Sequence, residues 1–234
     1  MKKLILCAAL TVGVVCAASA QDKIAFGVRA GVNINSLRYS GDSESLYNDL
    51  ESRAGFHVGA VMDWNVAGSF YIQPGIYFTT RGAKGEWSES DEEYSYKLTE
   101  KLNMSYLQIP VLASYRFAVS DAVKIDVNVG PYIAFGLGGK VKIEETESYM
   151  GETERTSDKY DIFGKSTDDK DKGDFKRFDA GLRFGAGVNI HRFYVGVSYD
   201  LGLTNLAHTG DDYRWSSKDK FKNGALNISV GYNF

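Results

Sequence analysis

Three histidines are the residues best suited to acid–base chemistry near neutral pH: His57, His191 and His208. His57 shares one alternating segment with Asp63, and a histidine beside a carboxylate or a serine is a common hydrolytic arrangement. Six residues of extended chain span roughly 20 Å, at about 3.3 Å per residue, so these two side chains do not meet. We therefore expect no catalytic residues, and a hydrolase is the least favoured interpretation.

Metal and cofactor chemistry has little support in the sequence. The acidic run Asp168–Asp174 is rich in oxygen ligands, but it lacks the spacing and terminal glutamate of an EF-hand, and Lys170 and Lys172 dilute its charge. We predict a solvated loop without a metal or cofactor, with weak calcium binding as the alternative. Both cysteines, Cys7 and Cys16, lie within the first twenty residues.

Those first twenty residues have the pattern of a secretory signal. Lys2 and Lys3 precede an apolar run, and Ala18-Ser19-Ala20 forms a small-residue cleavage site before Gln21. We therefore divide the chain into a cleaved signal peptide, residues 1–20, and one domain, residues 21–234. No later segment approaches the 18 or so apolar residues that a membrane-spanning helix needs.

Composition favours strands and disfavours a nucleic-acid partner. The chain holds 25 glycines, 3 prolines and 13% aromatic residues, a balance typical of strands and turns. Its formal charge is −3, and loss of the two signal lysines makes it more negative. Nucleic acid demands a basic patch, so we expect no such partner.

Eight segments alternate between apolar and polar residues with the period of two that a strand requires. The last, residues 224–234, is long enough to cross a bilayer when tilted, and it ends on Phe234. The connections alternate between long polar stretches and short turns. The long stretches are residues 36–52, 82–101, 138–176 and 204–223, and the short turns are 65–69, 118–122 and 191–192. An even strand number, with long loops at one end and tight turns at the other, is typical of an outer-membrane barrel.

The distribution of charge between the two faces separates a membrane barrel from a soluble one. One face of nearly every segment is apolar without interruption, whereas the other mixes glycine with charged and polar residues. Such charges cannot form a dry core, but they can pair inside a polar lumen. The expected lumen network comprises Arg29, His57, Asp63, Gln73, Arg81, Lys124, Asp126, Arg183 and Asp200. Because eight strands leave room only for side chains, we expect a filled lumen and not a channel.

The predicted fold is therefore all-β: an eight-stranded antiparallel transmembrane up-and-down β-barrel in the outer membrane, with long extracellular loops and short periplasmic turns. Its loops carry aromatic residues among the charges: Trp87, Tyr94, Tyr96, Tyr149, Tyr160, Phe163, Tyr213 and Trp215. Two interpretations fit them equally well. They form a binding surface, or they pack on one another over the mouth of the barrel.

Six runs of sequence resemble the small outer-membrane β-barrel family of Gram-negative bacteria that includes PorT. They are Gly27–Ile34, Gly55–Gly59, Ile72–Gly75, Tyr106–Pro110, Asn128–Tyr132 and Tyr194–Asn205. The resemblance implies an eight-stranded outer-membrane barrel. It implies much less about activity: PorT itself is linked to protein secretion, but most members have no assigned function, and fold does not determine function.

The favoured function is a non-enzymatic outer-membrane barrel that displays four extracellular loops in an envelope-structural or surface-interaction role. The alternative is a narrow pore or a secretion accessory of the PorT kind. Expected partners are outer-membrane lipid and lipopolysaccharide, the barrel-assembly machinery acting on the C-terminal strand, and an envelope or extracellular protein.

Overall fold

The computed structural model describes residues 23–41, 50–91, 94–150, 152–163, 173–209 and 215–234. Nine antiparallel strands make up most of them. The strands are β1 (Ile24–Ser40), β2 (Glu51–Ala67), β3 (Phe70–Ser90), β4 (Tyr94–Ala118), β5 (Val123–Tyr149), β6 (Glu152–Asp161), β7 (Phe178–Ile190), β8 (Phe193–Gly202) and β9 (Lys220–Asn233). The predicted signal segment, residues 1–20, lies outside the described residues.

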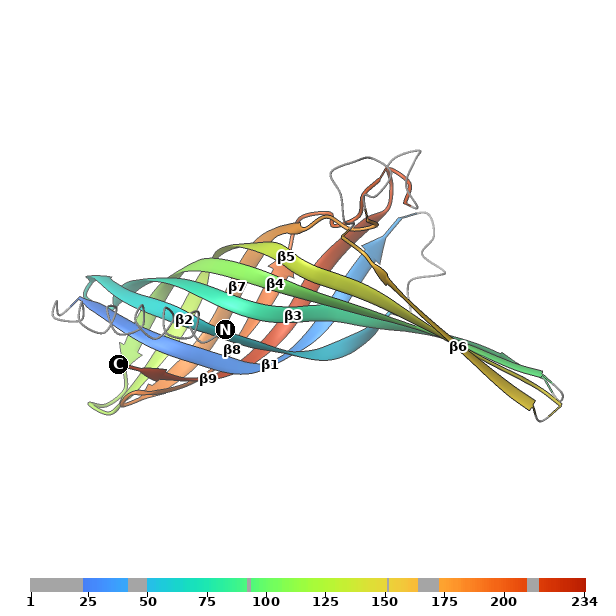
Figure 1. The fold of residues 1–234 in the computed structure, drawn as a ribbon. Helices are drawn as coiled ribbons and strands as arrows, with labels where there is room; N and C mark the ends of the chain where they lie inside the picture. Colours follow the sequence, from blue (N-terminus) through green and yellow to red (C-terminus); the bar gives the residue numbers. More distant parts are fainter. Residues whose placement is uncertain (1–22, 42–49, 92–93, 151, 164–172, 210–214) are drawn as a thin grey trace, which may run out of the picture.

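Eight of these strands close into a ring (Figure 1). The ring runs β1, β2, β3, β4, β5, β7, β8 and β9, and β1 pairs with β9 from Gly27–Asn233 to Ser40–Lys220. Closure satisfies the backbone of the closing strand, which would otherwise present an open edge to lipid. The predicted eight-stranded barrel is confirmed, and β6 is an addition outside the ring.

Tight turns join the strands at the end of the barrel where Phe234 lies (Figure 1). The β2–β3 turn holds Gly68 at a φ of 53°, and the two-residue β7–β8 turn holds His191 at a φ of 54°. The left-handed region suits glycine and is uncommon for other residues, so His191 occupies a strained position. This end carries the three predicted short turns and is the periplasmic one.

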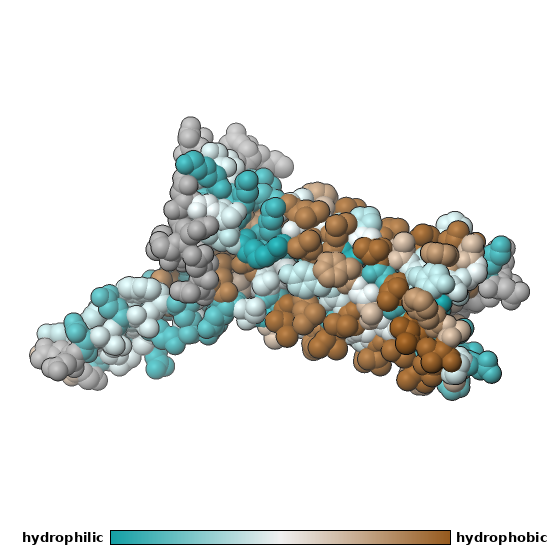
Figure 2. Space-filling model, turned by 180° about the vertical axis from the view of Figure 1, so that it is seen from behind, coloured by the Kyte–Doolittle hydropathy of each residue, from teal (hydrophilic) through white to brown (hydrophobic). Residues whose placement is uncertain are grey.

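The alternation of side chains follows the predicted facing. Val32 is 56% exposed while its neighbour Asn33 is 1% exposed, and on β5 Val129 is 53% exposed while Asp126 is 1% exposed. The exposed apolar residues form the hydrophobic surface seen over the barrel in Figure 2. Because the polar residues face inward, the apolar surface is the one that contacts lipid. Among the described residues no helix is long and apolar enough to cross a membrane.

Two of the predicted loops are largely strands, which corrects the sequence interpretation. Residues 82–101 belong to β3 and β4 apart from their tip, and residues 138–161 complete β5 and form β6. Together these segments make a four-stranded sheet, in the order β3-β4-β5-β6, that projects well beyond the barrel (Figure 1). Neither face of these segments is apolar without interruption, and for that reason they resemble loops in sequence. We call this sheet, residues 84–90, 94–101, 140–149 and 152–161, the extracellular arm.

Leu102 and Met104 break the apolar phase of β4 because they point into the barrel mouth. They are 7% and 2% exposed, and the same alternation of inward-facing side chains continues along β4 through Tyr106. The register shift lies opposite, since Ser105 pairs with Gly138 whereas Tyr106 pairs with Gly136. The additional residue, Leu137, forms a bulge in β5.

Candidate functional site

A buried ionic cluster crosses the lumen around Asp200. Arg183, directly opposite on β7, donates from Nε and Nη2 to the two carboxylate oxygens at 2.5 and 2.8 Å. Arg81 donates from Nη2 to Oδ2 at 2.6 Å, and Gln108 donates to the same oxygen at 3.2 Å. Asp200 is fully buried and Arg81 is 3% exposed, so one carboxylate is shared by two guanidinium groups out of contact with solvent.

A second ionic cluster lies on the periplasmic side, around Arg116. This guanidinium donates to Asp63 at 2.7 Å and to both carboxylate oxygens of Asp126 at 2.6 and 3.0 Å. Gln73 donates to Asp63 at 2.9 Å, and Asn189 donates to Asp126 at 2.7 Å. The predicted lumen network did not include Arg116, Gln108 and Asn189, although the alternation of side chains along the strands places all three on the inward face.

Most of the predicted lumen residues lie inside the barrel, and one does not. Arg29 is 4% exposed and lies 4.1 Å from the ring centre of Tyr194. Lys124, at the periplasmic end of β5, is exposed. Lys124 pairs with the buried, inward-facing Asn189 and so lies on the predicted face, but the strand has already emerged from the packed part of the barrel there.

His57 lies inside the lumen beside a serine. Its Nε2 is 2.9 Å from the hydroxyl of Ser229, a contact across the barrel that sequence spacing could not reveal. A hydrolytic arrangement needs an acceptor to orient the second ring nitrogen, and Nδ1 of His57 has no hydrogen-bond partner among the described residues. Asp63 is bound to Arg116 instead. His57 is 5% exposed, which makes a packing role the better account.

The extracellular mouth is closed by an apolar cluster that we call the mouth plug. Inward residues of β1, β3, β4, β5 and β9 meet residues of the connecting segments there. Its members are Leu37, Ala83, Leu102, Met104, Tyr106, Tyr132, Ala134, Val141, Ile162, Phe163, Phe175, Leu206, Ala207, Trp215 and Phe221. Backbone hydrogen bonds join the connecting segments, including Phe175 N to Ile162 O at 3.0 Å and Lys176 N to Leu206 O at 2.6 Å.

Two small cavities accompany this packing. One, of about 60 Å³, lies beside the plug, and the other, of about 50 Å³, lies in the lumen among Arg29, Arg183 and Tyr194. Each has room for a few waters and not for a continuous channel. The described lumen is therefore filled by side chains, as the strand number predicts.

The structure divides the aromatic residues that were predicted to lie in loops into a group packed in the mouth plug and a group on the arm. Trp215 and Phe163 are each 7% exposed and pack in the plug, and Tyr160 packs against it. Trp87 and Tyr149, in contrast, are 53% and 56% exposed on the arm. Tyr213 lies outside the described residues.

The two faces of the extracellular arm carry opposite charge. Residues paired directly across antiparallel strands place their side chains on the same face, so the registers assign every position. The face continuous with the plug, the arm inner face, carries seven acidic residues and no basic one among the described positions: Glu89, Glu100, Glu145, Glu147, Glu152, Glu154 and Asp158. It also carries Trp87, Tyr94, Tyr96, Tyr149 and Tyr160.

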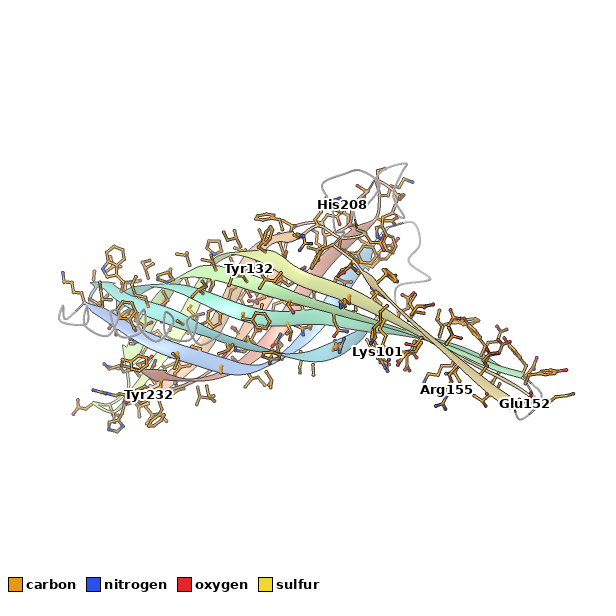
Figure 3. The ribbon with its side chains drawn as sticks, viewed as in Figure 1. Lys101, Tyr132, Glu152, Arg155, His208 and Tyr232 are labelled. Atoms are coloured by element: carbon orange, nitrogen blue, oxygen red, sulfur yellow. The ribbon has the colours of Figure 1, made fainter. Side chains whose placement is uncertain are left out.

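The opposite face, the arm outer face, continues the lipid-facing surface of β4 and β5. It carries seven basic residues, Lys84, Lys97, Lys101, Lys140, Lys142, Arg155 and Lys159, against three acidic ones, Glu86, Glu144 and Asp161. Hydrogen bonds from Lys101, at 2.5 Å, and from Lys142 lower the pKa of Glu144 to about 2. Figure 3 places Lys101 at the root of the arm and Arg155 farther toward its tip.

Metal binding finds no geometric support in the described residues, where no group of three or more histidine, cysteine or acidic side chains could hold an ion. The run Asp168–Asp174, considered for calcium, lies mostly outside those residues.

A closed ring with an apolar exterior and a polar, ion-paired interior defines an outer-membrane β-barrel protein. Residues 19–208 match the family described as outer membrane protein beta-barrel domain, so the chain belongs to that family and resides in the bacterial outer membrane.

Several solved barrels are similar at low identity. The attachment invasion locus protein Ail of Yersinia pestis is 16% identical, with 92% of this chain and 100% of that chain covered and a TM-score of 0.35. Neisserial surface protein A is 13% identical, with coverages of 89% and 97% and a TM-score of 0.36. The N-terminal barrel domain of Pseudomonas aeruginosa OprF is 12% identical, with coverages of 89% and 97% and a TM-score of 0.30. No match is found among curated proteins.

Proposed function

We propose that this protein is a non-enzymatic surface-interaction barrel whose extracellular arm presents the arm inner face to a protein with a basic surface. The observation that carries the proposal is the segregation of exposed aromatics and acids onto that face. Glu147 and Glu154 lie directly opposite each other, an arrangement that destabilises a sheet until a cation approaches. Trp87 and Tyr149 supply the large amphipathic contacts that are enriched at protein interfaces.

The proposal includes envelope and secreted proteins as partners. A secreted protein is included because the family that the sequence resembles contains PorT, which is linked to secretion. A conducting pore receives no support from the ionic clusters and the mouth plug, and we expect no steady conductance in planar bilayers. For insertion, we propose that the barrel-assembly machinery engages β9, the closing strand, which ends at Asn233 directly before Phe234.

The test is retention of proteins from envelope and secreted fractions on the purified, folded barrel, followed by mass spectrometry. A Trp87→Ala/Tyr149→Ala variant and a Glu145→Gln/Glu147→Gln variant should each lose the retained partner. The matched control is Ser88→Ala/Ser148→Ala on the arm outer face, which should retain it. Equal retention by all variants would show that the arm inner face is not the contact.

A further inference from the structure

An open hollow lies at the root of the extracellular arm, on the arm outer face. Its volume is about 530 Å³, and it spans β4, β5 and β6. Three lysines line it, Lys140, Lys142 and Lys159, together with Asn103, Ser105, Gly138, Gly139 and Asp161. The lining therefore combines ammonium groups with hydroxyl and amide groups, which suits an oxygen-rich anion.

The lysines of this hollow lie close to one another although their like charges repel. Lys142 lies directly opposite Lys101 on β4 and directly opposite Lys159 on β6, which makes a row of three like charges across three strands. Like charges directly opposite one another destabilise a sheet. Glu144 binds Lys101 and Lys142, but Lys140 and Lys159 form no ion pair with the described residues, although Asp161 lies in register with Lys140. An anion in the hollow would relieve this excess charge.

The distance of the hollow from the hydrocarbon layer indicates which anion it meets. Leu137, 52% exposed, is the last exposed apolar residue of β5 before the arm, and Lys140 follows three residues later. Three residues span about 10 Å of strand, or about 8 Å along the membrane normal at the usual strand tilt. The polar headgroup layer adds roughly 5–8 Å to each side of the hydrocarbon. Lys140 therefore lies at headgroup level. Lys142 and Lys159 lie two residues farther out on the same face, about 5 Å along the membrane normal, and their long side chains can reach back toward that layer.

We propose that Lys140, Lys142 and Lys159 form a binding site for the phosphate groups of lipopolysaccharide in the outer leaflet. The arm outer face and the lipid-facing surface are the same side of β4 and β5. A lipid whose acyl chains pack on Leu107 and Phe135 therefore presents its headgroup to these lysines. A basic cluster just outside the hydrocarbon layer attracts anionic headgroups in this way. The site anchors the root of the arm and leaves the arm inner face free. It is independent of the protein partner proposed above.

The experiment measures binding of diphosphoryl lipid A to the full, folded chain in detergent micelles by native mass spectrometry. We expect Lys140→Gln/Lys159→Gln to weaken binding at least five-fold. The matched control is Lys97→Gln/Arg155→Gln, which removes the same charge from the same face. Those residues lie level with Thr146, nine residues beyond Leu137, so binding should stay within two-fold of the wild type. Lys140→Arg/Lys159→Arg, which keeps the charge, should restore binding.

Two further arms distinguish the source of the phosphate. Dephosphorylated lipid A should bind the wild type at least five-fold more weakly, and millimolar inorganic phosphate should displace little diphosphoryl lipid A. Equal weakening in the control would overturn the site, because net charge alone would then account for binding. Equal binding of dephosphorylated lipid A would assign recognition to the acyl chains, and full displacement by inorganic phosphate would indicate a site for a soluble anion. Heat-modifiable mobility on gels verifies that each variant is folded.

Discussion

Arg183 and Asp200 lie directly opposite each other on β7 and β8 and form a bidentate ion pair, with Nε–Oδ1 and Nη2–Oδ2 distances of 2.5 and 2.8 Å. Arg81 reaches the same carboxylate from β3, so one aspartate binds two arginines from well-separated strands. The pair therefore connects distant parts of the ring inside the barrel. This connection leads to the first prediction.

Asp200→Asn should destabilise the barrel strongly, because it leaves Arg81 and Arg183 buried without their counterion. Breaking a buried ion pair costs about 3–5 kcal/mol, and that loss should appear in urea unfolding in lipid vesicles. Glu145→Gln, on the exposed arm, removes an equal charge and should change the free energy of unfolding by no more than about 0.5 kcal/mol. Similar values for the two variants would contradict a structural role for the Asp200 cluster.

Neighbouring residues near the middle of β5 test which face contacts lipid. Val129→Asp should place a carboxylate in hydrocarbon, at a cost of up to about 2 kcal/mol, somewhat less than the cost of a lysine at the same depth of a barrel. Asn128→Asp should cost less than about 1 kcal/mol, since it is nearly isosteric and Asn128 shares a lumen cavity with Arg29 and Arg183. Urea unfolding of both variants in vesicles gives the comparison, and the reverse order would invert the assigned facing.

Shortening the extracellular arm should leave the barrel intact. Thr146 and Arg155 lie directly opposite each other, so Asn-Gly in place of residues 147–154 rejoins β5 and β6 through a two-residue hairpin loop. The ring pairing is untouched, and the heat-modifiable band should remain on unheated gels. Loss of that band would show that the ring depends on the arm.

A larger deletion, residues 144–171, should also insert, because the closed ring still satisfies its own backbone. It removes Ile162 and Phe163 from the mouth plug, however, and should make the mouth more sensitive to protease than the shorter deletion does. Equal sensitivity of the two deletions would mean that these two residues do not hold the plug together.

The aromatic residues of the plug and of the arm should respond differently to truncation. Phe221 is 2% exposed, with ring centres of Trp215 and Tyr39 at 4.7 and 4.9 Å, so Phe221→Ala should cost about 3–5 kcal/mol. Trp87→Ala removes an exposed ring and should change the free energy of unfolding by about 0.5 kcal/mol or less. Urea unfolding in vesicles measures both, and a large effect of Trp87→Ala would place it in a packed core.

The carboxylate of Glu144 should stay ionised at acidic pH, where an ordinary glutamate is already protonated. Its folded pKa, about 2, lies below its ordinary value of 4.5 because Lys101 and Lys142 donate to the carboxylate. The stabilisation of the arm root by this group is therefore fully present above pH 4.5 and is lost as the pH falls through the folded pKa. A carbon-13 NMR titration of Glu144 checks this, and Lys101→Met/Lys142→Met should return the pKa toward its ordinary value. An unchanged midpoint in that variant would assign the shift to another cause.

The ring of eight strands, its lipid-facing side and its short periplasmic turns were determined by the sequence alone. The physical reason is that hydrocarbon tolerates neither an unpaired backbone nor a charged exterior, so Val32 and Asn33 must point in opposite directions. The same alternation placed Arg29, Asp126 and Asp200 in the lumen. It could not show that Lys124 is exposed at the end of β5, because alternation specifies a face and not the depth at which a strand leaves the packed interior.

Only the tertiary structure decided which inward residues meet. Arg81 with Asp200 and His57 with Ser229 are contacts across the ring, set by strand stagger and curvature, which local spacing does not contain. The extracellular arm was also missed by the alternation pattern, because one of its faces is polar, the other mixes acids with aromatic residues, and its strands are specified by their pairing partners. The registers alone separate its acidic face from its basic one. Glu147 and Lys142 look like members of one mixed-charge loop in the sequence, yet they lie on opposite faces of a sheet.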